Sequence, residues 1–474
     1  MAQATPQQPK MPHPTTRPVG GTEFSWCKAV PSGTGVTVLG LLFSKPPPIP
    51  IIQNALHNLQ NSNPILRSKI HHDFSTNTFH FLTPPNPTIQ IESFDFQSTA
   101  QIIQTESNGH DQNKTGPFQT LHEHEMNRNT WHDLDDVDSD VVYASVYEIS
   151  DQRFAVFIRI HTAACDRTAA VALLREMLRR VGGGGGGGDG EEEKVEEMNI
   201  AIEELIPMEK RNKPFWARGL DMLGYSLNAF RLGNLSFVDA ESPRTSKLVR
   251  MQMNTEETTN LVTGCKSRGI KLCGALAAAG MIASRTSKSL PEYQKEKYAV
   301  VTLIDCRSTL DPVLCSNHLG FYHSAIMNTH DVCGETLWEL ANRCYTSFVS
   351  SMNCNKHFTD MSDLNYLMCK AIENPGLTPS SSLRTALISV FEDTVIDDSA
   401  ENEMHKELGL EDYVGCASAN GIGPSLAVFD TIRDGKLDCI FVYPSPLHSR
   451  EQIQDLVDHM KTILVDACNS GNQI

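Results

Sequence analysis

The chain has 474 residues, of which 40% are hydrophobic and 20% charged, a globular composition with material for two to four domains. Its 40 Lys and Arg residues against 57 Asp and Glu residues give a net charge of −17. This charge repels polyanions, so we expect neither nucleic acid nor an anionic membrane as a partner. The longest apolar stretch, Gly274–Ala283, is only half as long as the roughly 20 residues that a membrane-spanning helix needs.

The 13 cysteines are spread along the chain without a CxxC pair, and the N-terminal segment is polar and proline-rich. We therefore expect reduced thiols and a cytoplasmic protein rather than a secreted disulfide framework.

The first half of the chain alternates helical and strand patterns. Apolar residues at helical spacing predict a helix over 51–59, and the run Phe154–Ile158, apolar on both faces, predicts a buried central strand. The other expected elements are strands at 78–82, 88–91 and 141–149 and a helix at 166–181. Where a buried strand runs directly into a helix, the residues between them lie at a strand end, and such ends commonly face a cleft.

A glycine run, Gly182–Gly188, followed by the acidic stretch Glu191–Glu197, predicts a disordered surface loop. We therefore expect an N-terminal domain at 1–200, a crossover at 201–243 and a C-terminal domain at 244–474. The expected elements of the C-terminal domain are strands at 247–253, 298–304, 320–327, 426–431 and 437–443, and helices at 256–267, 272–284, 335–348 and 449–468.

The chemically informative segment is Ile160–Arg167, with the sequence IHTAACDR, at the junction of the buried strand and the helix. His161 at the mouth of a strand is a candidate general base, because the reference pKa of histidine, about 6.5, is near neutral pH. Asp166 at the helix start is suited to cap that helix. By itself this spacing is also compatible with an ordinary capped junction.

The segment resembles the HHxxxDG motif of the CoA-dependent acyltransferase superfamily, which includes chloramphenicol acetyltransferase, condensation domains, alcohol acetyltransferases and the plant BAHD enzymes. Further similarities follow in the same order along residues 17–465: RPV with Glu23, NPILRSKI at 63–70, LIDCRS at 303–308 with LGFY at 319–322, and SANGIG at 418–423. The chain looks like a plant member of this superfamily, but an atypical one. It reads HTAACDR where the family has HHxxxDG, and the plant DFGWG motif is absent, since the matching region reads AVFDT at 427–431.

This resemblance implies an α/β fold of two chloramphenicol-acetyltransferase-like domains, each a mixed sheet flanked by helices, with a tunnel at their interface. It also implies that Asp166 has a structural role and pairs with Arg307. The family's base is the second histidine of the motif, where this chain has Thr162. Threonine is no base at neutral pH. Either His161 turns inward, which requires a bend at the strand end, or the site binds without turnover.

By the same resemblance, Ser418 and Asn420 are candidates to stabilise the oxyanion of the tetrahedral intermediate. No tightly bound cofactor is expected, and acyl-CoA would be a co-substrate. Its phosphates require basic residues, and the region between Arg244 and Lys297 carries ten Lys and Arg against four Glu. The candidates for binding CoA are Lys266, Arg268, Lys271, Arg285 and Lys288.

The predicted function is acyl transfer from acyl-CoA to the hydroxyl or amine of a small specialised metabolite, by a monomer. Two alternatives remain open: a diverged relative that binds a small molecule or acyl-CoA, and a catalyst of condensation or cyclisation in the same tunnel.

Other polar clusters are expected to be structural. One polar stretch contains His122, Glu123, His124 and His132. Their spacing fits no standard metal site, so we expect this stretch to be a surface loop. The acidic run from Asp133 to Asp140 lacks the glycine and glutamate of a calcium-binding loop. No metal site is predicted. His318 and His323 flank the LGFY segment and are secondary candidates to line the cleft.

Overall fold

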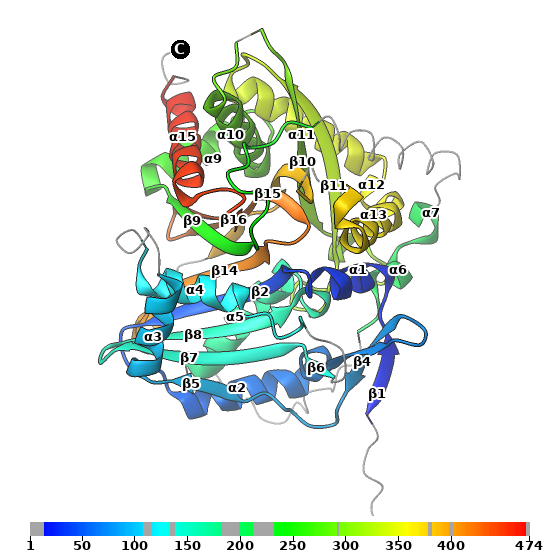
Figure 1. Cartoon of the computed structure of the whole chain (residues 1–474), viewed down its shortest axis with the longest axis vertical. Coiled ribbons are helices and arrows are strands. Elements are labelled where there is room, and N and C mark those ends of the chain that lie inside the picture. Colours follow the sequence, from blue (N-terminus) through cyan, green and yellow to red (C-terminus); the bar gives the residue numbers. More distant parts are fainter. Residues whose placement is uncertain are drawn as a thin grey trace, which may run out of the picture.

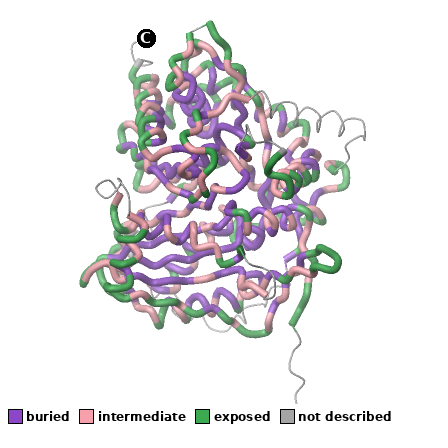
Figure 2. The backbone as a smooth tube through the Cα atoms, in the orientation of Figure 1, coloured by how far each residue is buried: buried purple, intermediate pink, exposed green. Residues whose placement is uncertain are grey.

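The computed structural model describes residues 14–107, 115–132, 138–182, 199–211, 232–291, 293–377, 382–397 and 402–470. The chain forms two halves, each built around a large β-sheet with helices packed against it (Figure 1). Buried residues are concentrated along the strands and inner helices of both halves (Figure 2). Most of the predicted glycine-rich and acidic loop, from residue 183 to 197, lies outside the described residues.

The lower half in Figure 1 contains a five-stranded sheet in the order β14-β2-β8-β7-β5. Its strands are β2 (Thr34–Phe43), β5 (Ile91–Phe94), β7 (Val142–Ser150), β8 (Arg153–His161) and β14 (Leu410–Ala419). The central position of β8 confirms the prediction from its apolar run, because a strand covered on both faces must be apolar on both. Helices α2 (Ile49–Ser62) and α5 (Arg167–Val181) pack on one face. Helices α3 (Phe96–Glu106) and α4 (Pro117–Asn127) pack on the other.

The upper half contains a seven-stranded mixed sheet in the order β11-β10-β12-β15-β16-β9, with β13 beside β15. Its strands are β9 (Thr245–Gln252), β10 (Glu296–Asp305), β11 (His323–Val332), β12 (Arg384–Phe391), β13 (Val395–Asp397), β15 (Gly423–Arg433) and β16 (Lys436–Ser445). The covering helices are α9 (Thr255–Ser267), α10 (Leu272–Ser287), α11 (Leu337–Asn353) and α15 (Arg450–Ser470).

Helix α10 is rich in small residues because its neighbours approach it closely. A Cβ atom at Gly274 would lie 3.1 Å from the carbonyl oxygen of Ala341 in α11, and one at Gly280 would lie 2.8 Å from the side chain of Ile388 in β12. These contacts place α10 in the middle of the upper core, which explains its almost continuous burial.

Smaller elements complete the fold. They are β1 (Thr15–Pro18), β3 (Lys69–Asp73), β4 (Thr78–Thr83) and β6 (Ser139–Asp140), which form a separate four-stranded sheet, and helices α1 (Gly21–Ala29), α6 (Ile202–Leu205), α7 (Met208–Arg211), α12 (Lys356–Thr359), α13 (Met361–Glu373) and α14 (Asn402–Leu408). No helix in the part of the chain that the structure describes is long and apolar enough to cross a membrane.

The predicted partition at residue 244 differs from the structure in one strand. β14, from the second half of the sequence, pairs antiparallel with β2 and so completes the sheet of the first half. The prediction of a strand over 320–327 is also wrong at its start: β11 begins at His323, because residues before it form a loop that wraps around Arg307. Of the predicted crossover, residues 212–231 lie outside the described part.

Candidate active site at the domain interface

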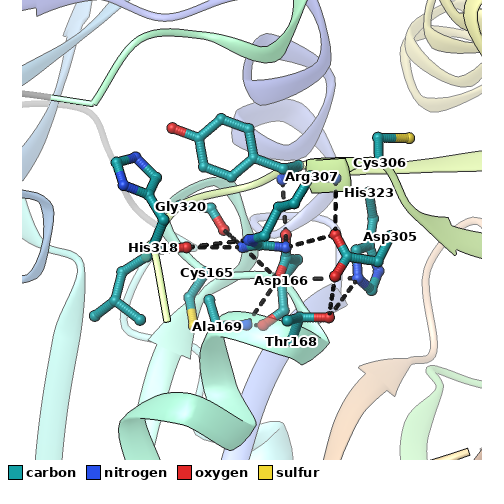
Figure 3. Close-up of polar contacts among 12 residues, drawn as sticks. Cys165, Asp166, Thr168, Ala169, Asp305, Cys306, Arg307, His318, Gly320 and His323 are labelled. Carbon is teal, nitrogen blue, oxygen red and sulfur yellow. Dashed lines mark hydrogen bonds and ion pairs between the residues drawn. The ribbon is translucent and has the colours of Figure 1, made fainter. Parts of the chain in front are cut away.

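The best-defined feature between the halves is a buried ion pair of Asp166 and Arg307. Asp166 caps α5 by accepting a hydrogen bond of 2.8 Å from the backbone N–H of Ala169. Arg307 Nη1 lies 2.9 Å from Asp166 Oδ2 and its Nη2 lies 3.1 Å from Oδ1 (Figure 3). Asp166 Oδ2 also accepts from the N–H of Tyr322 at 2.7 Å. The predicted pair is therefore present, and it ties the start of α5 to the upper half.

Burial and charge act against each other at this pair. The side chains of Asp166 and Arg307 are 1% and 2% exposed. Burial alone would raise the pKa of Asp166. The neighbouring His323 and Arg307, together with the hydrogen bonds that Asp166 accepts, hold the pKa of Asp166 below its ordinary value. Burial alone would lower the pKa of Arg307, but Asp166 and Asp305 raise it. Both groups are thus charged at neutral pH, and the pair is a fixed part of the interface.

His161, the last residue of β8, packs against Trp131, which belongs to a hydrophobic cluster with residues of both halves. Its ring contacts Trp131 edge to face at 5.3 Å, and its Nδ1 accepts a hydrogen bond of 3.1 Å from the N–H of Ala163. The side chain is fully buried, and burial lowers its pKa to about 3. The chain turns directly after His161 into a short 3₁₀ helix, Thr162–Ala164.

Thr162 points toward β2 instead. Its hydroxyl donates to the carbonyl of Gly35 at 2.6 Å, and since it has a single hydrogen, the hydroxyl of Thr37, 2.9 Å away, donates to it. A Cβ atom at Gly35 would lie 2.9 Å from the ring of Trp26 and 3.2 Å from Thr162 Oγ1. The position that holds the base in the resembling family is therefore occupied by a neutral, hydrogen-bonded hydroxyl.

The two oxyanion candidates differ in their surroundings. Ser418 Oγ accepts a hydrogen bond of 2.9 Å from the N–H of Val36, next to the residue that binds Thr162. Thr162 and Ser418 thus flank the start of β2. Asn420 is committed elsewhere: its Oδ1 accepts from Ser246 Oγ at 2.9 Å and its Nδ2 donates to the carbonyl of Arg244 at 3.1 Å.

The five basic residues predicted to bind CoA do not form one cluster. Lys266 and Arg268 are exposed at the end of α9, and Lys271 follows just before α10. Lys271 forms ion pairs with Glu392 at 2.8 Å and Asp393 at 2.6 Å. Lys288 and Arg285 lie at the other end of α10, a helix of 16 residues that spans about 24 Å.

Those two residues at the far end serve the local structure. Lys288 pairs with Glu296, and Arg285 is buried and donates to the carbonyls of Pro291 and Gln294. The basic residues are thus divided between the two ends of α10, with Lys271 before its first residue and Arg285 and Lys288 at its C-terminal end.

A cavity of about 190 Å³ lies between α5 of the lower half and the upper sheet. From α5 it is lined by Thr168 and two arginines, and from the upper sheet by Asp305, His323 and Phe391; its full lining is Arg167, Thr168, Val171, Ala172, Arg175, Leu303, Asp305, Ser316, His323, Phe391, Asp393, Thr394 and Val395. His323 Nε2 lies 3.1 Å from Thr168 Oγ1, which donates to Asp305 Oδ2 at 3.0 Å (Figure 3). Of the two secondary candidates, His323 lines this cavity and His318 does not, and no sequence pattern had singled out Thr168.

The predicted surface loop around His122 is wrong. Residues 117–127 form helix α4, in which His122 and Glu123 are buried. His122 lies 3.2 Å from the sulfur of Cys416, and burial lowers its pKa to about 3. Glu123 pairs with Arg450 at 2.8 Å. Within the described ranges no group of three or more His, Cys, Asp or Glu residues is arranged to hold a metal ion, and residues 133–137 of the acidic run lie outside them.

Comparison with known proteins decides the fold. No protein-family model and no curated protein matches the sequence. Among solved structures, a trichothecene 15-O-acetyltransferase from Fusarium sporotrichioides superposes with a TM-score of 0.68 at 11% identity, over 98% of this chain and 99% of that one. The condensation domain of the Monacolin K polyketide synthase superposes with a TM-score of 0.59 at 8% identity, over 97% and 98% of the two chains. The chain has the two-domain chloramphenicol-acetyltransferase-like fold. The predicted fold class, two chloramphenicol-acetyltransferase-like domains of mixed sheets flanked by helices, is thereby confirmed, and the resemblance holds for the fold.

Polyketide synthase associated protein 5 from Mycobacterium tuberculosis shares this fold, with a TM-score of 0.59 and 12% identity over 95% of this chain and 97% of that one. In this fold Asp166, Arg307 and His323 lie together beside the interface cavity. Thr162 and Ser418 each bind a backbone group at the start of β2, those of Gly35 and Val36. His161 belongs to neither group.

Proposed function

We propose that the chain transfers an acyl group from an acyl-CoA thioester to the hydroxyl or amine of a small metabolite. The observation that carries the proposal is the fold, which matches an acetyltransferase over nearly the whole length of both chains. The cavity between the halves, lined by titratable side chains from both, supports it further. Such a placement is typical of small-molecule sites.

The chemistry needs no resident cofactor. The acceptor hydroxyl or amine attacks the thioester carbonyl, a base takes the acceptor's proton, and the tetrahedral intermediate collapses with cleavage of the C–S bond. The CoA thiolate leaves and is protonated. Ser418 is suited to donate to the oxyanion, because its Oγ accepts from Val36 and its own hydrogen is not engaged with another described residue. Asn420 is unsuited, because both ends of its amide are engaged.

We place the nucleotide end of CoA at the corner of α9 and α10, where Lys266, Arg268 and Lys271 lie. Lys271 touches Asp393, a residue of the cavity lining, so this corner and the cavity are continuous along the surface. Arg285 and Lys288 are not part of the proposed site, because they lie at the other end of α10.

A second candidate function is binding of a small molecule or acyl-CoA without turnover. Two observations favour it: Thr162 occupies the position of the family's base, and His161 is fully buried against Trp131. If no other residue removes the acceptor's proton, the fold retains a binding cleft and loses catalysis.

The deciding experiment measures release of free CoA from acetyl-, malonyl- and hydroxycinnamoyl-CoA with a thiol reagent, with and without a mixture of hydroxyl and amine metabolites. Acceptor-dependent release with formation of an acylated product supports transfer. Thermal stabilisation by the acyl-CoA without release supports the binding function. A product that lacks the acyl group of the donor indicates condensation or cyclisation. Neither release nor stabilisation with any donor overturns the proposal.

A Lys266→Glu and Arg268→Glu double variant tests the position of CoA, and Lys288→Glu is its matched control. The first should raise KM for the acyl-CoA, because it reverses two exposed charges at the proposed corner. The second reverses a charge at the far end of α10, and KM should stay within twofold of the wild type.

A further inference from the structure

We infer that Arg384 is a positioning residue of the proposed transfer: together with Ser246 it fixes the backbone turn next to Ser418, the proposed oxyanion donor. The inference rests on the proposed function, since an oxyanion forms only if acyl transfer takes place. The turn, residues 419–424, is called the linking turn below. It joins β14 of the lower sheet to β15 of the upper sheet and follows Ser418 directly (Figure 1).

Arg384 binds the linking turn from the upper half. It is the first residue of β12 and is 5% exposed. Its Nη1 donates to the carbonyls of Ala419 at 3.1 Å and Pro424 at 2.8 Å. Its Nη2 donates to the carbonyl of Gly421, and its Nε donates to that of Ser382 at 3.2 Å. Three of these four carbonyls belong to the linking turn, so one guanidinium fixes the direction of three of its peptide groups.

The charge of Arg384 has no carboxylate partner in the described part of the chain. Its acceptors there are the four carbonyls. Burial and the neighbouring Arg244 lower the pKa of Arg384 to about 9, so the side chain is still charged at pH 7. By contrast, Arg307 and Arg167 each pair with an aspartate. Since a charged donor makes stronger hydrogen bonds than a neutral one, the charge of Arg384 acts mainly to hold the linking turn.

The backbone before Arg384 has an unfavourable conformation. Ser382 and Leu383 have φ of +46° and +62°, in the left-handed region that residues with a Cβ atom avoid. Such conformations persist where surrounding contacts hold them, and they concentrate at functional sites. Here the carbonyl of Leu383 accepts from the N–H of Gly423 at 3.1 Å, and that of Ser382 accepts from Arg244 at 2.7 Å. The strained pair is therefore part of the same contact with the linking turn.

Ser246 of β9 holds the linking turn at a second point. Its Oγ accepts from the N–H of Ala419 at 2.8 Å and donates to Oδ1 of Asn420 at 2.9 Å. Ala419 is thus bound at its N–H by Ser246 and at its carbonyl by Arg384. Because a single peptide bond joins Ala419 to Ser418, these contacts restrict the rotation of Ser418. Asn420, a candidate oxyanion donor from the sequence, instead helps to hold the turn.

The lower half completes the frame around Ser418. The N–H of Val36 donates to Ser418 Oγ at 2.9 Å. Gly421 lies so close to the start of β2 that a Cβ atom there would clash with the carbonyl of Ser32 and lie 2.9 Å from Thr34 Oγ1. A donor stabilises an oxyanion only when it lies about 2.7–3.1 Å from the oxyanion's position. A turn held less firmly would therefore lower the rate of the chemical step.

The test measures kcat and KM in the CoA-release assay for Arg384→Gln, Ser246→Ala and a matched control, Arg285→Gln. Arg285 is also buried and donates to carbonyls, those of Pro291 and Gln294, but it lies at the far end of α10. Arg384→Gln should lower kcat by about 10- to 100-fold with KM within about twofold, because an oxyanion donor acts in the transition state. Ser246→Ala should lower kcat by about tenfold, and the control should stay within about twofold.

A double-mutant cycle with Ser418→Ala separates positioning from general damage to the fold. Ser418→Ala alone should lower kcat by about 10²- to 10³-fold, the effect of losing one oxyanion donor. In the Ser418→Ala background, Arg384→Gln and Ser246→Ala should each change kcat by less than about twofold, because the group that they position is gone. Arg384→Lys keeps the charge without the planar fork, so its kcat should lie between those of the wild type and Arg384→Gln.

Circular dichroism shows which variants are folded, and if Arg384→Gln is not, Ser246→Ala carries the same cycle with the loss of one hydroxyl. Equal effects with and without the Ser418 hydroxyl would overturn the inference, since the variants would then act by another route. Unchanged kcat in the folded variants, or in Ser418→Ala, would overturn it while the proposed function stands. Absence of turnover in the wild type with every donor would overturn both.

Discussion

Replacement of Asp166 by Asn should destabilise the protein far more than replacement of an exposed acid in an ion pair of similar length. The variant removes the negative charge from a pair whose side chains are 1% and 2% exposed. Loss of one partner of a buried pair costs about 3–5 kcal/mol, because the remaining charge stays buried. Arg307 keeps Asp305 as a second partner at 2.9 Å, which favours the lower end of that range.

A second contribution comes from the backbone. The two oxygens of Asp166 accept from the N–H groups of Ala169 and Tyr322. An amide has one acceptor oxygen, so one buried N–H group loses its partner, at a cost of about 1–3 kcal/mol. We therefore expect Asp166→Asn to lower the free energy of unfolding by about 4 kcal/mol at pH 7.

The matched control is Glu411→Gln. Glu411 pairs with Arg153 at 2.8 Å, but the two side chains are 35% and 55% exposed, and an exposed pair contributes about 0–1 kcal/mol. Urea unfolding, followed by tryptophan fluorescence and circular dichroism, compares the three proteins. An equal loss in the two variants would refute the reasoning, because burial would then not decide the cost.

The sign of the pH dependence is a further check on Asp166. Its pKa in the folded protein lies below the ordinary value, so its contribution is complete above the unfolded pKa, about 3.9, and is lost as pH falls through the folded pKa. The difference in unfolding free energy between wild type and Asp166→Asn should not fall between pH 8 and pH 5, because Asp166 also favours the protonated form of His323, and it should shrink below about pH 4. A difference that already shrinks between pH 8 and pH 6 would contradict this assignment.

Three further changes test other parts of the fold. Gly35→Ala places a Cβ on a backbone with φ of +95° and against the Trp26 ring. We expect the free energy of unfolding, measured with urea, to fall by about 2–4 kcal/mol. A decrease below about 1 kcal/mol would contradict the close contact. His161 stays neutral in the fold down to a pKa of about 3, whereas the unfolded chain takes a proton near pH 6.5, so stability falls as pH drops below 6.5. In the wild type the free energy of unfolding should therefore decrease from pH 7 to pH 5, and His161→Gln should reduce this decrease by about 2 kcal/mol. An unchanged pH dependence of the unfolding free energy would show that His161 is not buried in the neutral form. Leu464→Ala removes a fully buried side chain of α15 from the upper core. It should lower the free energy of unfolding, measured with urea or heat, by about 2–5 kcal/mol. The control Gln454→Ala, at an exposed position of the same helix, should change that free energy by no more than about 0.5 kcal/mol.

The local patterns of the sequence determined much of the secondary structure and the fold class. The apolar run Phe154–Ile158 predicted the central strand, and the helical spacing of the last apolar residues predicted α15. These features follow from short-range geometry, because the period of side chains along a helix or strand is set by the backbone itself. The ordered series of motifs added the pairing of Asp166 with Arg307, which are 141 residues apart.

Only the tertiary structure decided which side chains meet at the interface. The strand end by itself does not say what surrounds His161, and only the fold brings Trp131 from another segment against its ring. Likewise, β14 joins the sheet of the first half through pairing with β2, and His323 meets Thr168 across 155 residues of sequence. Contacts of this kind depend on which surfaces the topology brings together, so a one-dimensional pattern of residue types does not contain them.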